Sequence, residues 1–258
     1  MATEIHHNQN LPDFFDCNCI LGKRSDRREG EPWSVDSLLK DMSYYNIKKA
    51  LVTYAPSKDY DAIFGNHQLI TQISAYKNLL PVWTIVPPHT PEMPLPKKFF
   101  EDSEKHGIVA FTAFPILQNF SLNNWSCGEL LKEIQKSHKP LLLPFSQTNW
   151  EEIHNLCSQY PNLSIIVHTV NYRQLRFLLP LWKIHSNLYV DTSWFSILDI
   201  IPFLEENNLI KHLLFGSNYP SYTPGASITL VTYANTSDQI KRSIACDNLQ
   251  NIINNIIQ

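Results

Sequence analysis

The segment DFFDCNCILGK (residues 13–23) is an apolar run that ends in a polar loop. Its aromatic residues favour a buried strand, and Gly22, followed by charged residues, marks the start of the loop. Seven further apolar runs follow at intervals of roughly 25 to 35 residues, the size of a strand–helix–strand unit. These runs cover residues 48–54, 80–86, 108–114, 139–145, 163–169, 187–193 and 212–218.

Amphipathic stretches lie between the strands and predict helices. Residues 34–46 begin with Ser34, a typical N-cap, and Leu38, Leu39 and Met42 follow it at helical spacing. Helices of the same kind are predicted at residues 149–160, 199–208 and 247–257, the last of them at the C-terminus.

The alternation of strands and helices predicts one α/β domain over residues 1–258, a single (β/α)8 TIM barrel with a C-terminal helix. We expect residues 1–11 to be a polar N-terminal tail. The alternative is an open, doubly wound sheet, but the chain has only seven glycines and no glycine-rich phosphate loop. Chemistry in a barrel lies at the carboxyl ends of the strands. The predicted strands end at Asn18, Tyr54, Pro87, Phe114, Phe145, His168, Ser193 and Asn218.

The composition restricts the classes of partner. The chain has 258 residues, 43% of them hydrophobic, and a formal net charge of −3. This balance gives no reason to expect binding to nucleic acid or to an anionic membrane, and no apolar run is long enough to span one. Five scattered cysteines favour a reducing compartment, so we expect a cytoplasmic protein. The sequence is compatible with a homo-oligomer.

Six phrases together resemble the amidohydrolase superfamily, in particular the amidohydrolase-2 branch that contains aminocarboxymuconate-semialdehyde decarboxylase and metal-dependent hydrolases of TIM-barrel fold. The resemblance extends over essentially the whole chain, and its first and last phrases are the most distinctive. The phrases are FFDCNCILG (14–22), IFGNHQL (63–69), GIVAFTAFP (107–115), PNLSIIVHTVNY (161–172), NLYVDTSWF (187–195) and LLFGSNYP (213–220).

The resemblance also implies a set of metal ligands, and this sequence departs from it. The family usually binds a divalent metal through two histidines of strand one, a histidine of strand five, often one of strand six, and an aspartate of strand eight. The corresponding positions here are Asn18, Ile20, a position at or beside Pro144, His168 and Asn218. Zinc needs three or four nitrogen, sulfur or carboxylate donors, and hard cations need negative charge. We therefore expect no tightly bound divalent metal and no other cofactor.

The two cysteines of the first strand are a second possible source of metal ligands. Strand alternation predicts that Asp16 and Asn18 face the barrel interior, whereas Cys17 and Cys19 face the surrounding helices. On that prediction the two thiols are buried structural residues, and they form no ligand pair unless the strand bulges.

The candidate acid–base residues are His168 and Asp191. His168 is either an acid–base group or a satisfied polar side chain at a strand end. Asp191 is the only carboxylate that the pattern brings near the barrel mouth. It either pairs with His168 or caps a loop.

The candidate substrate-binding residues surround the same strand ends. Asn18 and Asn218 offer neutral amides, and His89 lies in the proline-rich loop after the third strand. Arg24, in the charged loop over residues 22–31, is either solvated or able to bind a carboxylate, because guanidinium matches carboxylates bidentately. Trp194 forms either the wall of an apolar pocket or part of the core.

Two functions remain open on the sequence. The first is a hydrolase or lyase-like enzyme that acts on a small carboxylated or lactone-like molecule without the usual metal. The second is a pseudoenzyme, a non-catalytic barrel that binds a small ligand or a partner. Both predict a small anionic ligand. Asn18 and Asn218 lack general-base chemistry but retain hydrogen-bonding capacity, so whether the protein is an enzyme stays open.

Overall fold

Eight parallel strands form the barrel in a computed structural model that describes residues 12–197 and 199–256. The strands pair in the order of the sequence, from β1 to β8. Their bounds are β1 Phe14–Leu21, β2 Ile47–Tyr54, β3 Leu79–Thr84, β4 Ala110–Thr112, β5 Leu141–Pro144, β6 Ile165–His168, β7 Leu188–Asp191 and β8 Leu213–Leu214. Backbone hydrogen bonds from Cys17 to Phe215 (3.0 Å) and from Ile20 to Tyr219 (2.8 Å) join the segment after β8 to β1. The predicted TIM barrel is confirmed.

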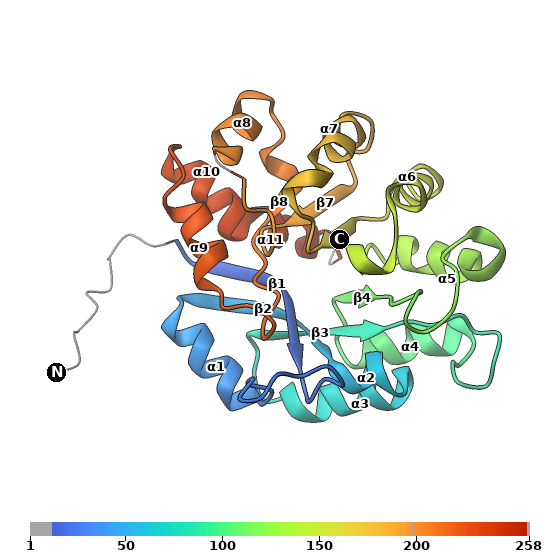
Figure 1. Cartoon of the computed structure of the whole chain (residues 1–258). Helices are drawn as coiled ribbons and strands as arrows, with labels where there is room; N and C mark the ends of the chain where they lie inside the picture. Colours follow the sequence, from blue (N-terminus) through green and yellow to red (C-terminus); the bar gives the residue numbers. More distant parts are fainter. Residues whose placement is uncertain (1–11, 198, 257–258) are drawn as a thin grey trace.

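Helices surround the strands, as Figure 1 shows. Ser34 caps the first of them, since its side chain accepts a hydrogen bond from the backbone of Ser37 at 3.2 Å, as predicted. No described helix is both long and apolar enough to cross a membrane. The helices are α1 Val35–Tyr44, α2 Ala55–Asp59, α3 Ala62–Ile73, α4 Pro96–Lys105, α5 Asn124–Lys136, α6 Trp150–Gln159, α7 Leu175–Ile184, α8 Ile200–Glu206, α9 Gly225–Thr232, α10 Asp238–Arg242 and α11 Asn248–Asn254.

Alternate strand residues build two apolar cores. One core lies between the strands and the outer helices, and the other fills the barrel with Phe15, Leu51, Val82, Ala110, Leu142, Ile166 and Leu214. The C-terminal helix α11 adds Leu249, Ile252 and Ile253 to the inner core and lies near the centre of the ring in Figure 1. The predicted C-terminal helix therefore closes one end of the barrel.

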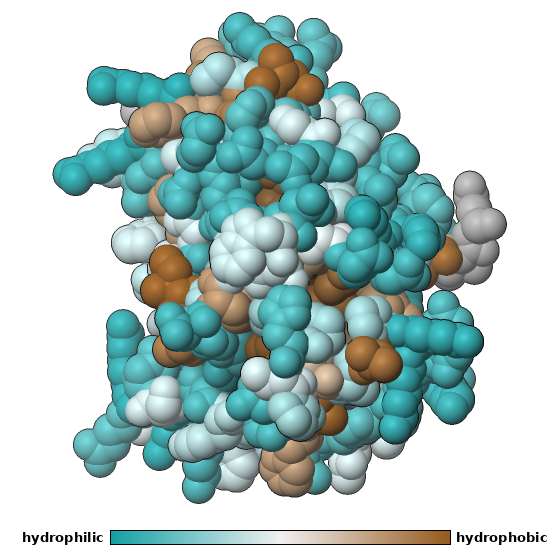
Figure 2. Space-filling view, turned by 90° about the vertical axis from the view of Figure 1, so that its right-hand side faces the viewer, coloured by the Kyte–Doolittle hydropathy of each residue, from teal (hydrophilic) through white to brown (hydrophobic). Residues whose placement is uncertain are grey.

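One face of the outer surface is mostly polar. The face that lies on the right of Figure 1, near α4, α5 and α6, is shown in Figure 2. Hydrophilic side chains cover most of it, and hydrophobic residues are scattered rather than gathered in one broad patch. Scattered apolar residues are usual on a soluble protein surface and carry no functional signal of their own.

A β-bulge interrupts β1 and corrects one prediction. Asp16 pairs with Ala50, and the next paired residues are Cys19 and Val52. The step is three residues along β1 but only two along β2, so β1 contains one extra residue here. Cys17 consequently belongs to the inner core, whereas Cys19 belongs to the outer one. The prediction that Cys17 faces the helices and Asp16 faces the interior is wrong, because the extra residue changes the alternation.

The buried Asp16 side chain holds this bulge in place. Its Oδ1 accepts hydrogen bonds of 3.0 Å from the backbone N–H groups of Asn18 and Ser217. One carboxylate oxygen thus joins the bulge to the segment that follows β8. After the bulge, Asn18 and Ile20 both face the carboxyl end of the barrel, where they line a cavity.

Two buried histidines lie in the outer layer. His212 donates from Nδ1 to the backbone oxygen of Leu188 at 2.7 Å and stacks on Trp182. A ring nitrogen of His185 lies 2.7 Å from one of His154. Burial lowers the pKa of His212, and burial together with the neighbouring His154 lowers the pKa of His185. Both imidazoles are therefore neutral in the folded protein near neutral pH.

The free energy of unfolding should fall as the pH drops below about 6.5, the ordinary histidine pKa. The folded pKa of each buried histidine lies below its unfolded value, so the unfolded chain takes up protons first and is favoured by acid. Urea unfolding at about pH 7.5 and about pH 5.5 measures the difference, which should be smaller in His185→Gln. The control is the exposed His138→Asn, since asparagine tolerates the positive φ of 56° at that position. Equal pH dependence in the parent and His185→Gln would contradict this account.

Candidate active site

A cavity of about 390 Å³ lies at the carboxyl ends of the strands. Side chains from β1, β2, β4, β5 and β6, and from the segment after β8, contribute to its wall. The lining residues include Asn18, Ile20, Arg24, Thr53, Lys58, Thr112, Phe114, Leu142, Pro144, His168, Thr169 and Asn218. The structure therefore brings together four of the residues selected from the sequence, Asn18, Arg24, His168 and Asn218.

Asp191, the last residue of β7, is the fully buried anion of the site. Its Oδ1 accepts hydrogen bonds from Thr169 N (3.0 Å), Ser193 N (3.3 Å) and Ser193 Oγ (2.8 Å). Its Oδ2 accepts from Asn18 Nδ2 (3.0 Å) and lies 3.3 Å from Nδ1 of His168. Burial by itself raises the pKa of Asp191, but the bonds from His168, Ser193 and Asn18 outweigh it and lower the pKa overall. The carboxylate is therefore ionised.

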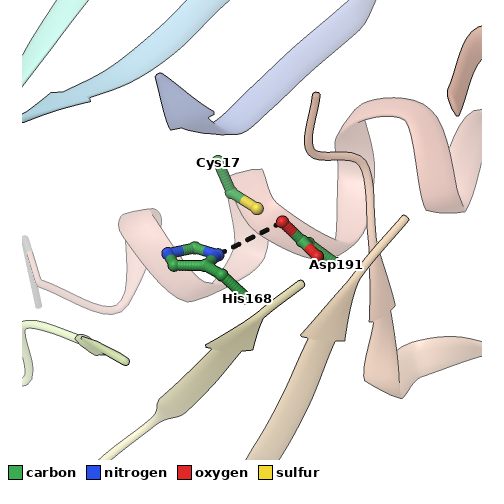
Figure 3. Close-up of side chains that lie close together, drawn as sticks. All are labelled: Cys17, His168 and Asp191. Atoms are coloured by element: carbon green, nitrogen blue, oxygen red, sulfur yellow. Dashed lines mark hydrogen bonds and ion pairs between the residues drawn. The ribbon is translucent and has the colours of Figure 1, made fainter. Parts of the chain in front are cut away.

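His168 ends β6 beside this carboxylate and is 4% exposed. Since Asp191 is ionised, Nδ1 of His168 donates to it, and the second ring nitrogen is left to accept a proton. Figure 3 shows that second nitrogen on the side of the ring away from Asp191. An imidazole that is oriented by a buried carboxylate and reaches a cavity has the geometry of an acid–base group.

Cys17 is the third side chain of this group, and its thiol points toward the other two in Figure 3. One donor atom each of Cys17, His168 and Asp191 lies within 4.8 Å of the other two. Burial raises the pKa of the Cys17 thiol well above its usual value, and the nearby Asp191 and Asp16 raise it further. The sulfur is thus a protonated thiol rather than an activated nucleophile.

Gly216 allows the segment after β8 to approach this group. A Cβ at this position would lie 2.7 Å from Oδ2 of Asp191 and 3.0 Å from Sγ of Cys17. The first distance is shorter than a Cβ contact allows and the second is tight, so any larger residue would displace the Asp191 side chain. The sequence analysis did not single out Gly216, although it lies in the most distinctive phrase of the C-terminal part.

Arg24 lines the cavity, but its charge is already paired. Its Nε and Nη2 donate to the two carboxylate oxygens of Glu31 at 3.0 and 2.9 Å, and Nη1 donates to Ser221. The Glu31 side chain is 5% exposed, so solvent screens this bidentate pair weakly. The guanidinium mainly orders the loop over residues 22–31.

Lys58 is a cation of the cavity that the sequence analysis missed. It belongs to α2, a short helix that begins directly after β2, and its side chain is 16% exposed. Its Nζ lies 3.5 Å from Oδ1 of Asp59, whose Oδ2 accepts from Ser25 N at 2.8 Å. The available signal is the phrase APSKD (55–59) after the second strand, where a barrel places its functional side chains.

The two remaining candidate residues lie outside the cavity wall. His89 lines a second cavity of about 550 Å³, which shares Lys58, Asp59 and Leu117 with the first. Trp194 is 50% exposed, and its ring centroid lies 6.3 Å from that of Tyr222. Among the described residues, neither His89 nor Trp194 lines the cavity that contains His168.

Gly216→Ala should lower the free energy of unfolding by about 1–3 kcal/mol, the usual cost of overpacking. The new methyl group would push Asp191 and Cys17 apart and so disturb the orientation of His168. Urea unfolding measures the loss. Gly225→Ala is the matched control, because its nearest neighbour would be 3.8 Å away. Equal stability of the two variants would show that the contacts around Asp191 are loose.

Comparisons with known proteins give a fold but no sequence family. No protein-family model matches the chain, and no curated protein matches it. Solved structures match over nearly the whole length at low sequence identity, and three of them illustrate the range.

The first is the 5-carboxyvanillate decarboxylase of Novosphingobium aromaticivorans, complexed with manganese and 4-hydroxy-3-methoxy-5-nitrobenzoic acid. Its TM-score is 0.74 at 12% identity, with 95% of this chain and 97% of that chain covered. The second is a probable 2-pyrone-4,6-dicarboxylic acid hydrolase of Acinetobacter baumannii with citric acid bound, at a TM-score of 0.69, 12% identity and coverage of 94% and 99%.

The third is the 2,6-dihydroxybenzoate decarboxylase of Rhizobium, with a TM-score of 0.68, 13% identity and coverage of 95% and 99%. Identities this low show a common fold and nothing finer. The resemblance inferred from the sequence is confirmed at that level: the chain has the TIM-barrel fold of the amidohydrolase-2 decarboxylases and hydrolases.

Proposed function

We propose that this barrel is a hydrolase- or lyase-type enzyme that acts on a small carboxylated or lactone-like molecule by acid–base chemistry at His168, without a divalent metal in the cavity. The observation that carries the proposal is the pair of His168, at the wall of the cavity, and the ionised, fully buried Asp191 beside it. A carboxylate that fixes the tautomer of an imidazole also stabilises the imidazolium that forms during proton transfer.

For a lactone, the pair supports hydrolysis by water. The second ring nitrogen of His168 accepts a proton from water as the new bond to the carbonyl carbon forms. The same proton passes to the ring oxygen as the carbon–oxygen bond of the lactone breaks. Asn218, a neutral amide in the cavity wall, is the candidate donor to the carbonyl oxygen.

For a carboxylated aromatic ring, the same imidazole supports a lyase reaction. The protonated imidazole of His168 would deliver its proton to the carbon of the aromatic substrate from which carbon dioxide leaves. Two of the structural neighbours described above are decarboxylases of carboxylated aromatics, which is why this class is included.

The donor atoms of the cavity support the metal-free form of the proposal. A related structure contains manganese, an ion that prefers carboxylate, carbonyl and water oxygens. The positions implied for ligands by the sequence resemblance do lie around one cavity, but Ile20 and Pro144 carry no side-chain donor. Both carboxylate oxygens of Asp191 are already hydrogen-bonded, and Cys17 is a protonated thiol. This set does not fit a manganese ion.

Lys58 is our candidate for recognising a carboxylate of the substrate. The neighbours contain citric acid and a nitrobenzoic acid, both small anions. Arg24 is held bidentately by Glu31, whereas Lys58 approaches Asp59 only to 3.5 Å and can exchange this partner for a ligand. Arg24 then acts by shaping the loop above the cavity.

A non-catalytic, ligand-binding barrel is the second candidate. The observation that favours it is the neutral character of Asn18 and Asn218, since neither amide can act as a base. The free cysteines Cys17, Cys19, Cys127, Cys157 and Cys246 support a reducing, cytoplasmic location under either function. Self-association stays a prediction.

Replacing His168 tests the enzyme against the binding barrel. A panel of aromatic acids, dicarboxylates and lactones is screened first by thermal shift and then for product formation by chromatography. His168→Gln should lower turnover at least about 100-fold and retain the thermal shift, because glutamine cannot relay the proton. His89→Gln, outside this cavity, should retain full turnover. Binding without turnover in the parent protein would establish the non-catalytic barrel instead, and no binding by any acid would contradict the assigned ligand class.

Turnover should also survive removal of metal. Protein dialysed against a chelator and assayed in metal-free buffer should retain its rate, since no step needs an ion in the cavity. Loss of activity on chelation, with recovery on addition of manganese, would show that the cavity recruits a metal after all.

A further inference from the structure

Two neighbouring helices on the outside of the barrel carry a second group of metal-binding side chains. His67 lies in α3, Asp102 lies in α4, and His106 is the C-cap of α4. Nε2 of His67 lies 3.4 Å from Oδ2 of Asp102, and Nδ1 of His106 lies 3.4 Å from Oδ1 of the same carboxylate. One donor atom of each residue lies within 4.8 Å of the other two. None of the three lines the cavity that contains His168.

The two imidazoles are held in place by a buried aromatic ring. The centroid of Trp83, which is 1% exposed, lies 5.4 Å from that of His67 and 5.7 Å from that of His106. Nδ1 of His106 donates to the backbone oxygen of Asp102 at 2.9 Å, so this nitrogen gives up that bond and its proton when it binds an ion. A ring that rests on a rigid neighbour loses little freedom on binding, so the positions of the two rings are set before any ligand arrives.

The spacing of the group suits a tetrahedral transition metal. Zinc with bonds to nitrogen of about 2.0–2.1 Å holds neighbouring donors roughly 3.3 Å apart. The separation between His67 and Asp102 is 3.4 Å. Two imidazoles and one carboxylate favour zinc, copper or nickel, whereas magnesium and calcium prefer sites made only of oxygen.

The exposure of the three residues leaves room for an ion to enter. The side chains of His67, Asp102 and His106 are 45%, 35% and 32% exposed. An ion at this position would keep at least one water ligand. The ion would also bring two positive charges to the single negative charge of Asp102. Without an ion, the two imidazoles balance that charge only when they are protonated.

We propose that His67, Asp102 and His106 form a binding site for a divalent transition metal of the zinc class, with Nε2 of His67, one carboxylate oxygen of Asp102 and one ring nitrogen of His106 as its protein ligands. The site links α3 to α4. Asn66, beside His67, bonds both the N–H and the carbonyl of Thr84 at 2.8 Å, so an ion here also braces the end of β3. The role of the ion is structural, and it is separate from the chemistry at His168.

Calorimetric titration of the full chain with zinc chloride tests the proposal. We expect one ion per chain and a higher melting temperature with zinc, but no effect of magnesium. His67→Gln, Asp102→Asn and His106→Gln should each weaken zinc binding at least about tenfold. His138→Asn, which changes an exposed histidine elsewhere, should bind zinc as the parent does. Circular dichroism checks that each variant is folded, and the three replaced side chains are all partly exposed.

Quenching of tryptophan fluorescence locates the ion independently. Copper(II) in this site lies next to Trp83 and should quench its emission, and Trp83→Phe should remove most of that change.

Two further variants test the competing sites. Cys17→Ala alters the thiol group in the barrel, and His6→Gln with His7→Gln alters a histidine pair outside the described residues. Unchanged zinc binding in all three single variants, at His67, Asp102 and His106, overturns the proposal. Zinc binding lost in Cys17→Ala or in the His6/His7 variant would also overturn it.

Discussion

The buried charge of Asp191 is the constraint on which the rest of the site depends. A carboxylate with no exposed surface stays ionised only if hydrogen-bond donors replace water, and here four neighbouring residues supply them. One of the donors is the backbone N–H of Thr169, a β-branched residue with a φ of 57°. Such a residue is strained in the left-handed region, and the bond to Asp191 offsets part of that cost. Segments from β1, β6 and β7 thus meet at a single anion.

The strands, the helices and their order could be predicted because each leaves a periodic signal in the sequence. Apolar runs of strand length repeat at regular intervals, and Ser34 and the C-terminal leucine and isoleucines mark helices by capping and spacing. His168 could be assigned to the cavity because it ends β6, in a barrel whose chemistry lies at that end. Asn218 also reaches the cavity, although β8 ends at Leu214, before the predicted end of that strand.

The residues that sequence reasoning placed wrongly or missed depend on tertiary detail. Cys17 and Cys19 lie on opposite faces because of an extra residue in β1, and strict alternation gives no sign of it. Gly216 is required by the side chains of two distant segments, and Lys58 lies in a helix of five residues, too short for a periodic pattern. Arg24 lines the cavity, and its pairing with Glu31 depends on the path of the loop, which the sequence does not show.

The bulge in β1 also divides that strand into two halves with different alternation of inward and outward side chains. Below the bulge, Phe15 and Cys17 follow the packing of the barrel interior, and above it Asn18 and Ile20 face the cavity. Because the change of phase falls between the halves, Cys17 packs in the barrel interior whereas Cys19 packs against the outer helices. A deletion of one residue at the bulge would exchange the inward and outward side chains of the upper half at once. A single inserted residue therefore decides which side chains of β1 reach the mouth of this barrel.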